Sequence, residues 1–386
     1  MAITLEEKPI FVIGAERSGT TLLMAMLGCH PRIAVPEVGW LFPRFYPYLY
    51  SYGNLGVEDN LRTLADEMLF GLNVHMWGMD LNPRTAVDVL LSNLRERSFA
   101  GVYCAMHELY SEKNGNKPRW GQKTPHNLYF VGPIKECFPN AQFVFITRDG
   151  RDASADYLES SFGPMNIFAA AESWKLCQNA VTPWREVLSP DDWMDVQYET
   201  LVREPERILR DVCTFLGEDY APEMLEFHKT EFCQNRGCTK DHKPLGKPVS
   251  DKYIGIYTQL LSLRDQQVFA AVAGQELVES GYSLDVEPYE ITLEDAELWR
   301  ERDGRIRAAL LDGTEGHILF ESYRDWVADQ REARKRKGIW QEGDAGKVFP
   351  EGDPNEELIV GYRAWRKWKE YLCIKRQYTR KGGIVL

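Results

Sequence analysis

The 386-residue sequence has no uninterrupted apolar run long enough to cross a bilayer, and its first residues lack the basic-then-apolar pattern of a signal peptide. It also has no excess of positive charge, because 58 acidic residues outnumber 46 basic ones and give a formal net charge of −12. Such a charge does not favour non-specific binding to nucleic acid. We therefore expect a cytoplasmic protein with no membrane span and no nucleic-acid partner.

The eight cysteines lack the paired spacing of a disulfide framework. We expect reduced thiols in apolar surroundings. Two cysteines and two histidines do cluster within a short segment: His228, Cys233, Cys238 and His242. Their spacing matches no common zinc finger or ribbon, so we predict a mobile loop there and no metal.

A phosphate-binding pattern is present, but it lacks the usual lysine. Residues 10–21 read IFVIGAERSGTT, an apolar run that leads through a small-residue turn into a helical pattern. A strand, loop and helix of this kind direct backbone N–H groups and a helix N-terminus toward an anion. A nucleoside-triphosphatase loop has lysine after its last glycine, whereas here Thr20 follows Gly19 and the cation is Arg17. We predict binding of a phosphate-like group without metal–triphosphate chemistry.

The pattern of apolar runs predicts the fold class. β-rich runs at 10–13, 143–147 and 193–197 are each followed by a loop and a helical pattern, which is typical of parallel βαβ units. We predict a three-layer α/β/α fold with a central parallel sheet and with ligands at the carboxyl ends of its strands.

Several segments, in order, resemble one family. RSGTT at 17–21 resembles the 5′-phosphosulfate loop of the sulfotransferases, which use 3′-phosphoadenosine 5′-phosphosulfate (PAPS). The other matching segments are GQKTP at 121–125, FPNAQFVFITRDGRD at 138–152, QYETL at 197–201 with 205–206 and 215–217, and 247–249 with 254–255. Each segment is a weak signal alone, but all of them in order are highly specific.

This resemblance implies a P-loop-like sulfotransferase fold and a PAPS-dependent enzyme that needs no metal. It implies that fixed cations, Arg17 and Lys123, stabilise charge on the departing phosphate and the sulfuryl oxygens. The donor-binding residues that it implies are Arg17, Ser18, Gly19, Thr20 and Thr21 at the 5′-phosphate, Arg148 and Ser154 at the 3′-phosphate, Tyr198 beside the adenosine, and Lys247 and Gly255 in a late loop.

The resemblance also suggests a general base. CHPRIAVPE at 29–37 resembles the tyrosylprotein sulfotransferase branch, in which a glutamate seven residues after the histidine accepts the acceptor proton. Glu37 is therefore our predicted base, since a carboxylate is ionised at neutral pH. His126 is the alternative, although it lies one residue beyond the position of the histidine base in the cytosolic branch.

Two positions depart from the family pattern. The family usually has serine eight residues after the arginine of the 3′-phosphate loop, where this chain has Asp156. Ser154 and Ser160 are the candidates for that role. The late loop reads Gly255-Ile256-Tyr257 in place of Gly-Arg-Tyr/Trp, so Lys247 or Lys252 is the candidate for the missing cation.

We predict a sulfotransferase domain over 1–288 and a mainly helical C-terminal extension over 289–386. Within the domain, 45–118 is predicted to be a helical insertion on the acceptor side, because apolar residues recur at helical spacing over 87–94. A hydroxyl on a small metabolite, carbohydrate, lipid or peptide fits as acceptor, and the sequence does not indicate an oligomeric state. The alternative functions are a nucleotide-dependent phosphotransferase on the same fold and a non-catalytic binding or scaffold protein.

Overall fold

The computed structural model describes residues 8–73, 77, 79, 85–160, 163–311 and 336. The chain forms two compact units. Val38–Lys113 belongs to one unit, and Leu5–Glu37 with Asn114–Leu310 forms the other. The boundary at residue 288 and the limits of the 45–118 insertion stay predictions.

The second unit contains a five-stranded sheet, in which every neighbouring pair of strands is parallel. The strands, in their spatial order, are β2 (Ile33–Ala34), β3 (Arg119–Lys123), β1 (Ile10–Ile13), β4 (Gln142–Thr147) and β5 (Trp193–Gln197). Val12 of β1 pairs with Lys123 of β3 and Val144 of β4. The carboxyl ends of these three strands therefore meet at one edge of the sheet.

The two faces of the sheet bury different side chains, because successive residues of a strand point to opposite sides. On one face, Val12 and Val144 share an apolar core with Leu23 of α1 (Thr20–Gly28) and Leu209 of α10 (Pro205–Leu216). The aromatic residues of β1 and β4 make up the other face.

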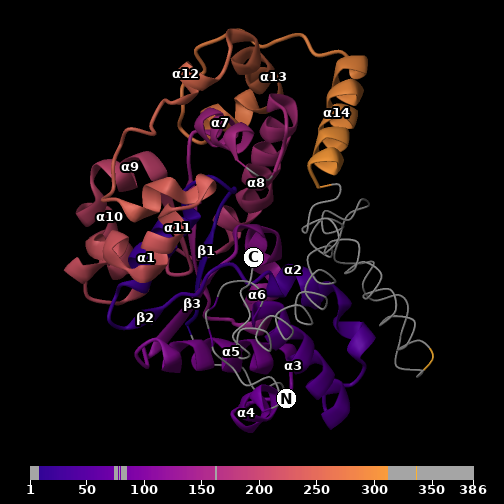
Figure 1. The fold of residues 1–386 in the computed structure, drawn as a ribbon, viewed down its shortest axis with the longest axis vertical. Coiled ribbons are helices and arrows are strands. Elements are labelled where there is room, and N and C mark those ends of the chain that lie inside the picture. Colours follow the sequence, from indigo (N-terminus) through magenta and orange to yellow (C-terminus); the bar gives the residue numbers. More distant parts are fainter. Residues whose placement is uncertain are drawn as a thin grey trace, which may run out of the picture. The chain divides into compact units, whose positions relative to one another are not determined.

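On this aromatic face, the Phe11 and Phe143 rings stack with centroids 5.6 Å apart. Phe138, which follows α6 (Val131–Cys137), lies 6.3 Å from Phe11, and Arg185 of α8 (Ile167–Val187) lies over Phe145. The predicted α/β/α layering with a parallel sheet is confirmed (Figure 1).

This unit contains further helices. They are α7 (Gly150–Glu159), α9 (Tyr198–Arg203), α11 (Glu231–Gly237), α12 (Tyr257–Leu260) and α13 (Leu263–Glu279), with 3₁₀ helices η2 (Pro125–Phe130), η3 (Pro222–Lys229) and η4 (Lys240–Gly246). Trp174 of α8 packs on Phe269 of α13 with ring centroids 5.8 Å apart. Of the predicted extension, α14 (Leu293–Leu311) is helical, and the residues after it lie outside the described part except Arg336.

The unit that contains 38–113 is helical where it is described. Its helices are α2 (Leu41–Phe45), η1 (Tyr46–Tyr52), α3 (Glu58–Asn73), α4 (Ala86–Ser92) and α5 (Phe99–Lys113). Phe42, Phe99 and Tyr103 form an aromatic core, with Phe42 5.2 Å from each of the other two ring centroids. α4 buries Val87 and Leu90, as the helical spacing over 87–94 predicts. No helix in the described ranges has both the length and the apolar character needed to span a membrane.

Candidate active site

The loop between β1 and α1 has the backbone of an anion cradle. Gly14, Arg17 and Gly19 all have positive φ angles, which turn the chain sharply into α1. Within the described residues, no side chain caps the N-terminus of α1, so its first N–H groups stay available to a ligand. The Ser18 hydroxyl is buried and has no hydrogen-bond partner among the described residues. A nucleotide phosphate fits this loop, because it would accept hydrogen bonds from these groups.

Gly19 is required where the loop meets Tyr198, the first residue of α9. A Cβ atom at position 19 would lie 2.6 Å from the Tyr198 ring, and the φ angle of +96° disfavours any side chain. We expect Gly19→Ala to lower the free energy of unfolding by about 1–3 kcal/mol, measured by urea denaturation. Gly217→Ala is the matched control, because Gly217 also has positive φ, but no described residue beyond its own helix and chain neighbours lies within 4 Å of such a Cβ. Equal losses in the two variants would contradict the clash.

One carboxylate links Arg17 of the loop to a second arginine beside it. Arg148, directly after β4, donates to the Arg17 carbonyl at 2.9 Å and stacks 4.8 Å from the Tyr198 ring centroid. Asp156 of α7 accepts from Arg17 at 2.8 Å and from Arg148 at 3.1 Å. The structure thus brings Arg17, Arg148 and Tyr198 together, with an aspartate between the arginines.

Lys123 ends β3 at the same edge of the sheet. It is buried, and burial lowers the pKa of its ammonium group to about 8. The nearby Glu37 carboxylate acts against this shift, and the Arg236 guanidinium adds to it. Lys123 is therefore mainly charged at neutral pH and loses its charge just above it.

Glu37, the predicted base, follows β2 and is 5% exposed. Arg236 of α11 donates to both of its carboxylate oxygens, at 2.9 and 2.6 Å. This bidentate pair fixes the orientation of the carboxylate.

His126, the alternative base, lies on η2 beside the phosphate loop. Its Nδ1 is 3.7 Å from a Glu16 carboxylate oxygen, and Glu16 also accepts a hydrogen bond of 2.5 Å from the Tyr157 hydroxyl. Burial lowers the pKa of His126, so the ring is neutral at neutral pH. The Glu16 carboxylate thus lies near the neutral His126 ring beyond hydrogen-bond distance of Nδ1, whereas Glu37 pairs with a cation.

The sequence did not predict that η4 is part of the site. Its Asp241 carbonyl accepts from Arg17 at 2.8 Å. Burial and three neighbouring cations lower the pKa of His242 to about 4. These cations are Arg17, Lys123 and Arg236. The only sequence signal in this segment was the cluster of cysteines and histidines, and no group of three or more metal-ligating side chains occurs among the described residues.

The remaining predicted donor residues lie in different environments. Ser154 is buried and its hydroxyl has no partner within the described ranges, whereas Ser160 donates to the Tyr157 carbonyl. The Gly255 N–H donates to Asp152 at 2.7 Å, which holds the late loop against α7. Lys247 and Lys252, the candidates for the missing cation, are both exposed. Thr20 is buried and Thr21 half-buried at the start of α1.

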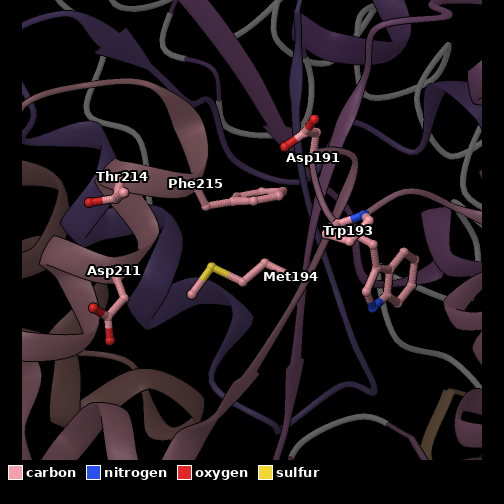
Figure 2. Close-up of a pocket in the computed structure, with 7 residues that line it drawn as sticks. Asp191, Trp193, Met194, Asp211, Thr214 and Phe215 are labelled. Atoms are coloured by element: carbon pink, nitrogen blue, oxygen red, sulfur yellow. The ribbon is translucent and has the colours of Figure 1, made fainter.

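A separate pocket lies away from these residues. Figure 2 shows Trp193, Met194 and Phe215 around this pocket, which has a volume of about 480 Å³. Trp193 is the first residue of β5, so this pocket lies at the opposite end of that strand from the carboxyl edge. It contains none of the predicted site residues.

The phosphate loop and two arginines lie at the carboxyl edge of a parallel sheet, an arrangement that suits the phosphate groups of a nucleotide. A family model described as "Sulfotransferase family" matches residues 9–222, which is more than half of the chain. The chain belongs to the sulfotransferase family, as its motifs predict.

Two relatives and one solved structure are similar to this chain. A protein-tyrosine sulfotransferase of Drosophila melanogaster is 26% identical over 246 residues, which are 62% of this chain and 42% of that protein. An uncharacterized protein of Aquifex aeolicus (strain VF5) is 26% identical over 240 residues, 58% of this chain and 27% of that protein. The chain thus spans less than half the length of either relative.

The solved structure is the sulfotransferase domain from the Synechococcus PCC 7002 olefin synthase. It is 17% identical with a TM-score of 0.48, and the match covers 70% of this chain and 95% of that domain.

Proposed function

We propose that this protein transfers a sulfuryl group from PAPS to a hydroxyl group of an acceptor. This proposal rests on the phosphate loop, whose cation is Arg17. A buried Lys123 and a buried Glu37 lie at the same edge of the sheet as this loop. Arg17, Ser18 and the N-terminus of α1 would hold the 5′-phosphate, and Arg148 with Tyr198 would hold the nucleoside end.

The donor supplies a sulfuryl group attached to a phosphate leaving group. The acceptor oxygen bonds to sulfur, the bond from sulfur to the bridging oxygen breaks, and the phosphate keeps the electron pair. Arg17 and Lys123 stabilise the charge left on that phosphate. Glu37 accepts the proton of the acceptor hydroxyl, and Arg236 orients its carboxylate. Fixed cations take the role that a divalent metal has in phosphoryl transfer.

This chemistry requires only that the acceptor carries a hydroxyl group. A peptide tyrosine, a sugar, a lipid head group and a small phenol or alcohol each carry one. The relative that is named a protein-tyrosine sulfotransferase supports a phenolic hydroxyl as the first acceptor to test.

The test is sulfuryl transfer from sulfur-labelled PAPS to a panel of these four acceptor types in the presence of a metal chelator. We expect label in at least one hydroxyl acceptor. We also expect Arg17→Ala to reduce the rate by about 10²–10³, because it removes a charge that stabilises the leaving phosphate. Phosphate transfer from Mg-ATP to the same acceptors, with no sulfuryl transfer, would contradict the proposal and favour a phosphotransferase.

A further inference from the structure

Asp156 is a carboxylate placed in what is otherwise a site for an anion. One of its oxygens accepts from Arg17 at 2.8 Å and the other from Arg148 at 3.1 Å. The Arg148 side chain is only 4% exposed, whereas the Asp156 side chain is 34% exposed. The aspartate therefore approaches the buried arginine from the more open side of the site.

The two arginines have the features of a built phosphate site. Both follow neighbouring parallel strands at their carboxyl ends, and Arg17 belongs to the phosphate loop itself. Arg148 Nε and the Ser154 hydroxyl are buried without a partner among the described residues. Donors in this arrangement suit the planar and tetrahedral anions that arginine binds. The Asp156 carboxylate already fills part of this site.

A carboxylate beside Arg148, which the proposed function places at the nucleoside end, changes which ribose substituent the site can accept. It repels a phosphate group, since like charges a few ångströms apart disfavour one another. It accepts a hydrogen bond from a hydroxyl group. Dinucleotide-binding proteins use the same distinction, with an acidic residue for a free ribose hydroxyl and an arginine for a ribose phosphate.

We propose that Asp156 is a specificity-determining residue that lets this site accept an adenosine 5′-phosphate with a free 3′-hydroxyl about as well as one with a 3′-phosphate. This inference rests on the proposed function, because it takes the loop as the site of a nucleotide 5′-phosphate. It extends the donor class to adenosine 5′-phosphosulfate, which differs from PAPS only by the missing 3′-phosphate.

The experiment is calorimetric titration with 3′-phosphoadenosine 5′-phosphate and with adenosine 5′-phosphate, without metal. We expect the wild-type protein to bind the two nucleotides with dissociation constants within about tenfold, a difference of no more than 1.4 kcal/mol. In Asp156→Ser we expect the bisphosphate to bind at least about tenfold tighter, with adenosine 5′-phosphate bound equally or more weakly. Asp156→Asn keeps the shape of the side chain and removes its charge, so we expect it also to bind the bisphosphate more tightly than the wild-type protein does.

Asp211→Asn is the control for net charge. Asp211 is exposed on α10 and pairs with Arg207 on the surface, so its loss should leave both affinities unchanged. Wild-type preference for the bisphosphate by more than about a hundredfold, unchanged in Asp156→Ser, would overturn this inference and leave the proposed function intact. Binding of neither nucleotide would overturn both.

Discussion

We expect Glu37→Gln to lower kcat by about 10²–10⁴, the range for loss of a general base. The substitution keeps the size of the side chain and removes its capacity to accept a proton at neutral pH. Binding of 3′-phosphoadenosine 5′-phosphate should be unchanged, since no donor-binding role is assigned to Glu37. The measurement is steady-state sulfuryl transfer, with calorimetry of the bisphosphate on the same preparation.

The Glu37–Arg236 pair calls for a specific control. Glu37→Gln leaves the Arg236 guanidinium without its carboxylate, and breaking a buried ion pair destabilises a protein. The double variant Glu37→Gln with Arg236→Met removes both charges, and Arg236→Met alone removes only the cation. If Glu37 is the base, the double variant stays as slow as Glu37→Gln and Arg236→Met alone is much faster. Equal rates in all three variants would show that the pair matters only for structure.

We expect Lys123→Met to lower kcat by about 10²–10³, the cost of removing one group that stabilises charge in the transition state. Methionine fills a similar apolar volume, so the buried end of β3 should stay packed. The bisphosphate should bind with little change, because the ammonium group acts mainly on charge that develops during transfer. An unaltered kcat would contradict the role of Lys123.

The lowered pKa of Lys123 leads us to expect a particular pH dependence of turnover in the wild-type protein. Burial lowers this pKa to about 8, and a lysine is charged only below its pKa. Turnover should therefore be retained below pH 8 and fall as the pH rises through that value. Residual activity of Lys123→Arg should show no such decline, because a guanidinium group stays charged. A flat profile to pH 10 in the wild-type protein would contradict a catalytic ammonium group at this position.

The sequence predicted the strands that carry a continuous apolar signal. Residues 10–13 and 193–197 coincide with β1 and β5, and 143–147 lies within β4. β3 was not predicted, because Arg119–Lys123 reads RWGQK and has little apolar or β-branched character. It becomes a strand through pairing with its neighbours β1 and β2 on either side. Tertiary pairing of this kind is not visible in local propensity.

The residues of the candidate site were likewise predicted only in part. Arg17, Lys123 and Arg148 follow recognisable motifs at the ends of strands, and a parallel sheet brings such positions to one edge. Arg236 was missed because it contacts Glu37 from 199 residues further along the chain, with no motif around it. The Asp156 bridge was also missed. The sequence shows that Asp156 departs from the family pattern, but it does not show which cations the carboxylate contacts.

The most direct test of this account is calorimetric binding of 3′-phosphoadenosine 5′-phosphate in the presence of a metal chelator, with ATP and ADP titrated in parallel. We expect saturable binding of the bisphosphate without metal and loss of that binding in Arg17→Ala. Preference for Mg-ATP once metal is restored, or binding of no nucleotide at all, would contradict a sulfuryl donor site in this protein.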